Sequence, residues 1–358
     1  MSATGAPRGA GFHVLRVARV DRLTDDAAAV TFEVPPGLAA QYAFAAGQSL
    51  TLRRVVGGAE HRRSYSICSP AGSPPRIGVR EVPGGLFSSW LVHDVRPGDE
   101  VEVQVPSGSL RADPAEPARH LMIAAGSGIT PLLSIAATVL ANPKAEVRLL
   151  FGNRTTGSVM FAEELGDLKN RYFSRFQVVH VLSREPRDVP LFSGRLDAGR
   201  LRQLLPAVVP ASDADHAWLC GPLPMVMAAR DVLAGLGVAR ERIHVELFYV
   251  DEPPPPVERA EQVATGETSD VTIVLDGASS TMAMPKAAAI LDSAQATRAD
   301  LPFACKGGVC GTCRARVTSG EVSMRRNYAL EENELADGFV LTCQARPVSA
   351  EVTVDFDA

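Results

Sequence analysis

The sequence predicts a multidomain protein in which three folds follow one another: an antiparallel β-barrel, a doubly wound α/β domain, and a small α+β domain of the β-grasp type. Short β-type runs separated by Gly and Pro occupy the first 110 residues. From Arg119 onward, apolar strands alternate with helical stretches, which is typical of a parallel sheet. Four successive prolines at 253–256 then separate the last segment, because such a run cannot join a helix or a central strand.

The boundaries of these parts follow from the same observations. We expect the barrel within residues 1–113, where the runs VLRVARV, AVTFEV and VEVQV read as strands. The α/β domain is expected within 114–250 and a Pro-rich linker within 251–268. The α+β domain is expected within 269–358, with a hairpin, a helix over 286–299 and further strands.

One apolar stretch is long enough to suggest a membrane span. Leu121 to Pro143 contains no charged residue. Gly126, Gly128 and Pro131 interrupt it, however, in the pattern of strand, tight turn and helix. A buried α/β unit is therefore favoured over a membrane helix.

Charge and the N-terminus limit the function classes. The chain has 36 Lys and Arg against 41 Asp and Glu, a net charge of -5, which argues against a general nucleic-acid binder or a polybasic membrane protein. From Asp251 onward there are 17 acids and 9 bases, which leaves 27 bases and 24 acids in the first 250 residues. The N-terminus shows no basic segment followed by an apolar one, so we expect a cytoplasmic protein.

Four of the six cysteines have a diagnostic spacing. Cys305, Cys310, Cys313 and Cys343 form C-x4-C-x2-C-x29-C, the spacing of plant-type [2Fe-2S] clusters. The glycines among them allow a tight loop whose N-H groups can face the cluster sulfurs. The alternatives are a zinc site, which usually uses repeated C-x2-C pairs or His, and a disulfide pair, which needs an oxidising compartment. The predicted last domain contains no His.

Two segments of the predicted barrel resemble the flavin motifs of the ferredoxin-NADP reductase superfamily. In RRSYSICS, the resemblance implies that Arg63 contacts the FAD pyrophosphate, Tyr65 packs against the flavin, and Ser66 hydrogen-bonds near flavin N5. Gly78-Val79-Arg80, followed by PGGLFSSWL, resembles the second segment. There, backbone N-H groups at a helix start can hold phosphate oxygens. That segment contains Gly84, Gly85 and Ser88.

A third segment resembles the nicotinamide site of the same superfamily. Gly126, Gly128 and Thr130 belong to a G-x-G-x-x-P turn between an apolar strand and a helix, where glycines permit close approach of a phosphate. Cys220 and Gly221, in Cys-Gly-Pro at the end of a later strand, match its partner in the family. Core packing is the alternative for Cys220, and it is the favoured interpretation for Cys68, which lies outside the cluster spacing.

Residues after three further strands complete the predicted site. Arg154, Ser183 and Arg184 are expected near the adenosine end, and the Ser-Arg pair resembles the one that grips the 2'-phosphate in NADP-dependent members. NADPH is therefore favoured over NADH. The resemblance also implies that Glu246 lies near the nicotinamide and Phe248 on the flavin face, although both could be ordinary strand residues.

The order of the three domains resembles the single-chain reductases of bacterial multicomponent oxygenases. The C-terminal phrases NYALE and ELADGFVLTCQ are similar to those of reductase components that serve phenylacetyl-CoA 1,2-epoxidases. The resemblance implies electron transfer from NADPH through FAD and [2Fe-2S] to a di-iron oxygenase, with Ser66, Cys220 and Glu246 as catalytic residues. Reductases of steroid-ring or aromatic-ring oxygenases, and a non-catalytic electron carrier or redox sensor, remain as alternatives.

Overall fold

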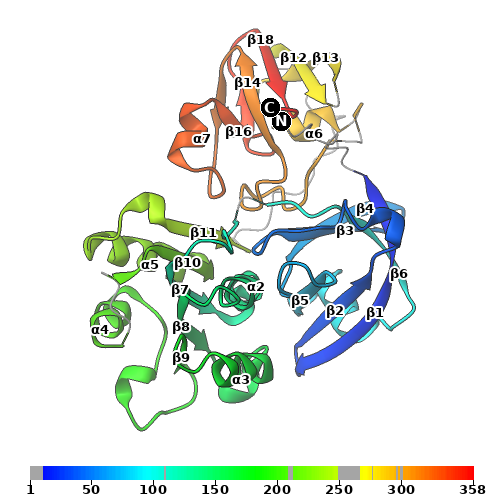
Figure 1. Cartoon of the computed structure of the whole chain (residues 1–358). Helices are drawn as coiled ribbons and strands as arrows, with labels where there is room; N and C mark the ends of the chain where they lie inside the picture. Colours follow the sequence, from blue (N-terminus) through cyan, green and yellow to red (C-terminus); the bar gives the residue numbers. More distant parts are fainter. Residues whose placement is uncertain are drawn as a thin grey trace. The chain divides into compact units, whose positions relative to one another are not determined.

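The computed structural model describes residues 11–108, 110–208, 213–248, 267–275, 277–295, 297–298 and 301–358. The chain divides into two compact units, a larger one over His13–Tyr249 and a smaller one that contains Val250–Ala358. The larger unit holds an antiparallel and a parallel sheet, and the smaller unit holds a mixed sheet (Figure 1). The predicted fold class is confirmed. Most of the predicted linker, 251–266, lies outside the described residues.

The first sheet is an antiparallel barrel in the order β4-β3-β6-β1-β2-β5. Its edge strands meet through a bridge between Ile67 and Ile77, and the Cys68 N-H donates to the Arg76 carbonyl at 2.7 Å. Alternating apolar residues such as Leu50 and Leu52 fill the interior. The elements are β1 (Phe12–Thr24), β2 (Ala27–Glu33), η1 (Pro36–Leu38), β3 (Ser49–Val56), β4 (Ala59–Ser66), β5 (Arg76–Arg80), α1 (Ser88–His93) and β6 (Glu100–Gln104).

The second sheet is parallel, in the order β11-β10-β7-β8-β9. Helices α2 and α3 lie on one face and α4 and α5 on the other (Figure 1). The strand order reverses between β7 and β10, so a crevice is expected at their carboxyl ends. The elements are β7 (Arg119–Ala125), η2 (Gly126–Gly128), α2 (Ile129–Val139), β8 (Glu146–Asn153), η3 (Thr156–Ser158), α3 (Ala162–Arg171), β9 (Phe176–Leu182), η4 (Pro190–Phe192), α4 (Ala198–Val208), β10 (His216–Gly221), α5 (Leu223–Gly235), η6 (Arg240–Arg242) and β11 (Ile243–Leu247).

The apolar stretch from Leu121 to Pro143 forms most of β7, the turn η2 and helix α2, as its Gly and Pro pattern predicts. Ten of the eleven residues of α2 are buried, which explains the absence of charge. Among the described residues, no helix is both long and apolar enough to cross a membrane.

The barrel packs on helix α2 and the start of α3 of the α/β domain through a glycine. A Cβ on Gly78 of β5 would collide with the Thr130 methyl group and lie 2.8 Å from the ring of Phe161. Phe161 itself is buried and has a left-handed backbone with φ of 58°. Nearby, Arg76 of β5 forms ion pairs with Asp21 and with Glu164 of α3, at 3.0 and 3.1 Å. These contacts join the two domains of the larger unit.

The smaller unit contains a five-stranded sheet in the order β13-β12-β18-β14-β16 and a two-stranded sheet of β15 and β17. Strands β12 and β18 are parallel, while β12 and β13 form the predicted hairpin. The predicted helix over 286–299 is shorter, because Ala289 has an extended backbone and α6 begins after it. The elements are β12 (Thr268–Leu275), β13 (Ala278–Pro285), α6 (Ile290–Ala294), β14 (Arg314–Ser319), β15 (Val322–Met324), α7 (Glu332–Ala336), β16 (Phe339–Leu341), β17 (Ala345–Pro347) and β18 (Glu351–Asp355).

Candidate cofactor sites

The G-x-G-x-x-P turn lies at the carboxyl end of β7, against the carboxyl end of β10. A Cβ on Gly128 would collide with the carbonyl group of Cys220 and lie 2.8 Å from the Gly221 nitrogen. Gly221 has φ of 154°, and a Cβ there would lie 2.8 Å from the Met225 side chain. The two segments matched in the sequence are therefore in direct backbone contact, and both glycines are required sterically.

A half-buried arginine of the barrel reaches the same turn. The Arg80 guanidinium lies 3.1 Å from the position of a Cβ on Gly126 and donates to the Ser158 carbonyl. Asp26 pairs with Arg80 at 3.4 Å and with Arg154 at 2.6 Å. Arg80 thus brings positive charge to a turn that is shaped for phosphate. In the sequence, Arg80 belongs to the second flavin-like segment, but no local pattern assigns it a role of its own.

Ser66 and Glu246 meet across the two domains. The Ser66 hydroxyl, at the end of β4, donates to Glu246 Oε2 in β11 at 3.1 Å. Burial raises the pKa of Glu246 to about 8, and the hydrogen bond from Ser66 offsets part of this increase. The carboxyl is therefore mostly neutral at pH 7. The hydrogen bond that positions this carboxyl group joins two residues 180 positions apart in the sequence.

Cys220 and Phe248 differ in exposure. Cys220 lies beside Glu246 in the pairing of β10 with β11, is fully buried, and belongs to the hydrophobic core. Burial, with a smaller contribution from Glu246, raises the pKa of the Cys220 thiol well above its usual value, so this thiol is neutral. Phe248 follows β11 with 37% of its surface exposed, as expected for a ring that could cover a bound group.

The other flavin-motif residues lie on β4. Arg63 is exposed and donates to the Arg62 carbonyl at 2.7 Å, while Tyr65 packs against the barrel core. Arg63 and Tyr65 share one face of the strand, and Ser66 points to the other. Burial raises the pKa of Tyr65, which keeps its hydroxyl protonated.

The second flavin-like segment forms a tight loop before α1. Gly84 has φ of 71°, and a Cβ on Gly85 would collide with the Ser88 hydroxyl and lie 2.8 Å from the Val82 carbonyl. The Ser88 hydroxyl accepts a hydrogen bond from the Val82 N-H at 3.0 Å. Ser88 therefore fixes the loop from within.

Arg54 of β3 supports the same loop from outside. Its guanidinium lies 3.8 Å from the centre of the Trp90 ring and donates to the Leu86 carbonyl at 3.4 Å. Sequence reasoning did not select it, because no local motif surrounds it.

The residues expected near the adenosine end are neighbours. The Ser183 and Arg184 N-H groups donate to the carbonyls of Asn153 and Arg154, at 2.9 and 2.8 Å. Arg184 is exposed. Glu185 is held away from it, because the Thr156 N-H and hydroxyl both donate to this carboxylate at 2.7 Å. The Arg184 side chain is thus available for an anion at the carboxyl edge of the sheet.

The loop that carries the first three cysteines is shaped to surround sulfur. Lys306, Gly308 and Gly311 have φ of 51°, 79° and 67°. The Gly307 and Cys310 N-H groups point at Cys305 Sγ, at 3.3 and 3.4 Å. Hydrogen bonds from the Cys310 thiol and then from the backbone lower the pKa of Cys305 to about 5, which favours the thiolate form. This donor arrangement fits an iron-sulfur cluster.

The four cysteines are grouped in pairs. All six cysteines of the chain are free. The thiols of the predicted ligands lie in two hydrogen-bonded pairs, Cys305 with Cys310 and Cys313 with Cys343. Two thiolates for each of two irons match this grouping.

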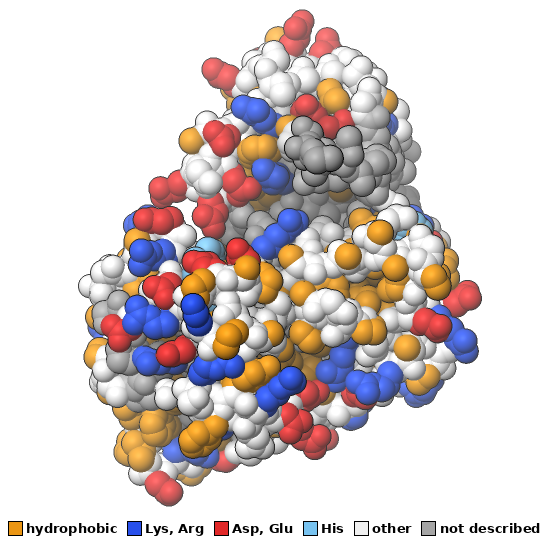
Figure 2. All heavy atoms as spheres, viewed as in Figure 1, with side chains coloured by type: hydrophobic (Ala, Val, Ile, Leu, Met, Phe, Trp, Pro, Cys, Tyr) orange, Lys and Arg blue, Asp and Glu red, His pale blue; other side chains and the backbone are white. Residues whose placement is uncertain are grey.

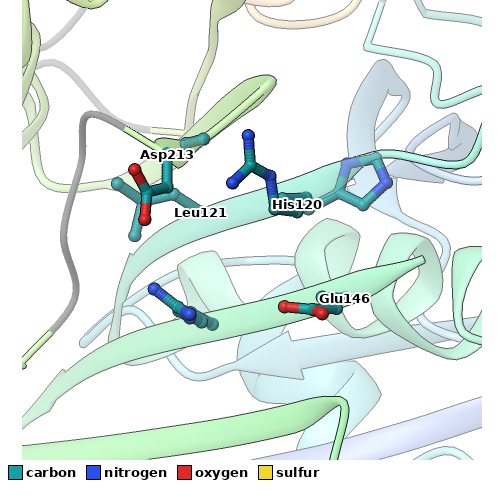
Figure 3. Close-up of a pocket in the computed structure, with 7 residues that line it drawn as sticks. His120, Leu121, Glu146 and Asp213 are labelled. Atoms are coloured by element: carbon teal, nitrogen blue, oxygen red, sulfur yellow. The ribbon is translucent and has the colours of Figure 1, made fainter. Parts of the chain in front are cut away.

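Two cavities of the larger unit lie away from these residues. One, of about 10 Å³, is lined by residues at the amino ends of β7 and β8, including His120 and Glu146, and has room for about one water molecule (Figure 3). The other, of about 320 Å³, lies between the barrel and helices α2 and α3. Cys68, Arg76 and Tyr172 line it. Neither is lined by a predicted site residue.

Comparison with known proteins identifies each domain. Residues 14–111 match the family of oxidoreductase FAD-binding domains, residues 122–231 match oxidoreductase NAD-binding domains, and residues 273–348 match 2Fe-2S iron-sulfur cluster binding domains. The chain is therefore an NAD(P)H-dependent flavin and iron-sulfur oxidoreductase. The predicted FAD and [2Fe-2S] cofactors and the enzyme class are confirmed.

Relatives of similar length narrow the class. The chain is 42% identical over 352 residues to a subunit of the 1,2-phenylacetyl-CoA epoxidase of Escherichia coli, covering 97% of this chain and 98% of that protein. It is 34% identical to the ferredoxin reductase component of 3-ketosteroid-9-alpha-monooxygenase from Mycobacterium tuberculosis, with 97% of each chain covered. The chain belongs to this family of single-chain reductases.

A solved structure shares the complete fold. Phthalate dioxygenase reductase matches with a TM-score of 0.59 at 24% identity, covering 97% of this chain and 98% of that chain. At this identity the likeness concerns the fold alone. It supports the succession of three domains seen here.

Proposed function

We propose that this protein passes electrons from NADPH through FAD and a [2Fe-2S] cluster to the oxygenase component of a multicomponent di-iron monooxygenase that epoxidises phenylacetyl-CoA. The similarity to a component of such an epoxidase, which extends from end to end at 42% identity, is the observation that carries the choice of partner. The proposed cluster ligands are Cys305, Cys310, Cys313 and Cys343.

The contact between Ser66 and Glu246 supports the proposed place of hydride transfer. Bound FAD would supply acceptance of a hydride and release of single electrons, which the cluster then carries. Ser66 comes from the barrel and Glu246 from the last strand of the nicotinamide domain, so their hydrogen bond at 3.1 Å brings both binding regions to one point. Arg63, Tyr65 and the loop containing Gly84, Gly85 and Ser88 would hold FAD.

The nicotinamide nucleotide would extend along the carboxyl edge of the parallel sheet. Its pyrophosphate would lie at the turn of Gly126, Gly128 and Thr130, where Gly221 and Arg80 also lie. Ser183 and the exposed Arg184 would bind the 2'-phosphate of NADPH, because a guanidinium fork suits phosphate. Arg154, already paired with Asp26, would add positive charge at this end. Phe248 would cover the flavin ring and be displaced by the nicotinamide.

The charge of the smaller unit supports electron transfer within the chain. Glu331, Glu332 and Asp337 of the α7 region are exposed, and acidic side chains, drawn in red, are frequent on this unit (Figure 2). The last 108 residues are net acidic, whereas the first 250 are slightly basic. Opposite charge would favour docking of the two units, and their covalent link would keep the effective concentration high. Such a protein would work in the cytoplasm.

Reconstitution tests the proposal. Purified protein mixed anaerobically with NADPH should lose both flavin and cluster absorption. It should then support NADPH-dependent oxidation of phenylacetyl-CoA when the epoxidase components are added. If neither chromophore bleaches, the protein is an electron carrier or sensor and the proposed enzyme is wrong.

A reductase for a steroid-ring oxygenase is the second candidate, because the ketosteroid monooxygenase reductase is 34% identical over 361 residues. A reductase that serves an aromatic-ring Rieske oxygenase is the other form of this second candidate. Bleaching by NADPH without support of the epoxidase, together with support of a steroid or Rieske oxygenase, would overturn the proposed partner and keep the reductase chemistry.

A further inference from the structure

Gln344 follows the last cysteine and is among the most deeply buried polar side chains of the smaller unit. Only 2% of its surface is exposed. A buried primary amide needs partners for two donors and an acceptor, since leaving any of them unmatched destabilises the fold. The Gln344 amide nitrogen bonds to atoms of the cysteine region, and its amide oxygen accepts from Arg325.

The Gln344 amide nitrogen donates to two atoms of this region. Nε2 lies 2.8 Å from the Lys306 carbonyl, next to Cys305, and 3.6 Å from Cys343 Sγ. Lys306 has the left-handed backbone that begins the cysteine loop. One side chain therefore joins the loop of the first three cysteines to the segment that carries the fourth.

The amide oxygen is held from the other side. Nε and Nη2 of Arg325 both donate to Gln344 Oε1 at 3.4 Å, and the Arg325 N-H donates to the Gln344 carbonyl at 3.0 Å. This fixes which end of the amide faces the sulfur, because a guanidinium can only donate. The NH2 group must therefore point toward Cys343.

The loop leaves space for this side chain. A Cβ on Gly308 would lie 3.0 Å from Gln344 Cγ and 3.3 Å from the Arg326 carbonyl. On the other side of Cys343, the Thr342 hydroxyl donates to the Cys313 carbonyl at 2.9 Å. The residues before and after Cys343 thus each bind a backbone carbonyl in the loop that carries the other three cysteines.

We propose that Gln344 is a positioning residue that locks the cysteine loop and, by donating to Cys343 Sγ, makes the [2Fe-2S] cluster easier to reduce. Hydrogen bonds to cluster sulfurs stabilise the more negative, reduced state and raise the reduction potential. Reduction adds one negative charge, so a fixed donor dipole gains more interaction with the reduced cluster than with the oxidised one. The inference rests on the cluster ligands proposed above.

Two substitutions test this role by redox titration of the cluster in the full-length protein, followed by EPR. Gln344→Met keeps the length of the side chain and removes both donors. It should lower the ratio of reduced to oxidised cluster about threefold at a fixed potential, since part of one charge-assisted hydrogen bond is lost. Gln344→Glu also adds negative charge, which Arg325 keeps ionised. It should lower the ratio about tenfold, equivalent to a midpoint about 59 mV more negative.

Gln295→Glu is the matched control. Gln295 accepts a hydrogen bond from the Lys306 side chain and, within the part of the chain that the structure describes, makes none to a cysteine sulfur. The control introduces the same charge beside the Lys306 ammonium and away from the cysteine sulfurs, so its ratio of reduced to oxidised cluster at a fixed potential should stay within about twofold of the wild-type ratio. Equal midpoints for wild type and both Gln344 variants, or an equal shift in Gln295→Glu, would overturn the role of Gln344.

Two further observations separate this inference from the ligand assignment. A wild-type protein without [2Fe-2S] absorption would remove the ligand set itself, whereas an intact spectrum with unchanged midpoints removes only the role of Gln344. If Gln344→Met loses its cluster, the positioning role is supported. The effect on the midpoint potential is then measured on Gln344→Glu. In wild-type protein labelled with ¹⁵N only at the glutamine side-chain amide, pulsed EPR of the reduced cluster should detect a coupled nitrogen; its absence would contradict the hydrogen bond.

Discussion

The two ends of the parallel sheet both bury titratable side chains, yet they are built for different purposes. At the carboxyl end, Glu246 has a pKa raised to about 8 and bonds to one hydroxyl from another domain. At the amino end, burial and neighbouring histidines lower the pKa values of His120 and His244 to about 4.

The histidines of the amino end form hydrogen bonds with one another and with nearby Trp218 and Glu116. Trp218 Nε1 donates to His120 Nδ1 at 3.1 Å, and His216 bridges His244 and Glu116 at 3.1 and 3.0 Å. The Trp218 and His244 rings stack with centroids 4.2 Å apart. A strongly shifted pKa is therefore not enough to mark a site; the carboxyl end also has glycine turns and a strand-order reversal.

Of the substitutions at the two ends of the sheet, Gly128→Ala should have the largest effect on activity. The added Cβ would collide with the Cys220 carbonyl and displace the turn from β10. A misplacement of about 1 Å lowers kcat/KM about 100-fold, so we expect a loss of this size in NADPH-dependent flavin reduction. The control is Gly166→Ala in α3, where nothing lies within 4 Å of the added Cβ. Normal turnover by Gly128→Ala would refute the tight turn.

Arg184→Ala should change the preference between nucleotides. Loss of one charge-assisted hydrogen bond to a phosphate costs about 1.5–3 kcal/mol. We expect KM for NADPH to rise by about 10- to 100-fold while KM for NADH changes little. Arg187→Ala, which removes the same charge from an exposed position three residues later, is the control. Equal increases for both nucleotides would show that Arg184 does not bind the 2'-phosphate.

Glu246→Gln should remove a pH dependence and leave the rate at pH 7 within about threefold of the wild type, because the carboxyl is already neutral there. Above pH 8 the ionised carboxylate of the wild type would stabilise the cationic ring of the oxidised nicotinamide. The rate of flavin reduction by the wild type should therefore rise about tenfold across pH 8. An interaction energy equivalent to one pKa unit corresponds to a factor of about ten. Stopped-flow measurement should show no rise in Glu246→Gln. The exposed Glu241→Gln variant should behave like the wild type.

Substitution at the amino end should affect stability and leave catalysis unchanged. Trp218→Phe removes the donor to His120 and should cost about 1 kcal/mol of unfolding free energy. Because His120 and His244 stay neutral in the folded protein down to about pH 4, stability is present above pH 6.5 and is lost as the pH falls from 6.5 toward 4. Thermal unfolding at pH 7.5 and 5 measures both effects. If wild type and Trp218→Phe melt at the same temperature at pH 7.5, the hydrogen-bond effect is wrong. If the wild type melts at the same temperature at pH 7.5 and pH 5, the histidine effect is wrong.

The sequence was sufficient for the fold class because its periodicity is local. Alternating runs, strand-helix alternation and the four prolines each act over a few residues, and glycine turns such as Gly126 to Gly128 have one sterically suitable geometry. The helix over 286–299 was overestimated, because Ala289 adopts an extended backbone that no composition rule indicates. Tertiary context overrides propensity in such short segments.

The sites were only partly predictable, because sequence patterns report local structure and not contacts between distant segments. Motif residues such as Ser66 and Gly128 could be selected one segment at a time, but the contact of Ser66 with Glu246 depends on how two domains pack. Arg80 and Gln344 gained their roles from neighbours far away in the chain, the Gly126 turn and Lys306. A resemblance in sequence therefore locates motif residues, whereas a supporting side chain needs three-dimensional contacts to be recognised.

Phe161 has a consequence for how the protein folds. A non-glycine residue in the left-handed region costs about 1–3 kcal/mol and persists only where surrounding contacts impose it. Its ring fills the space left by Gly78 of the barrel, so the start of α3 relies on a strand from another domain. Separate expression of the barrel and the nicotinamide domain would leave that cost uncompensated. These two domains should therefore melt together in a single cooperative transition.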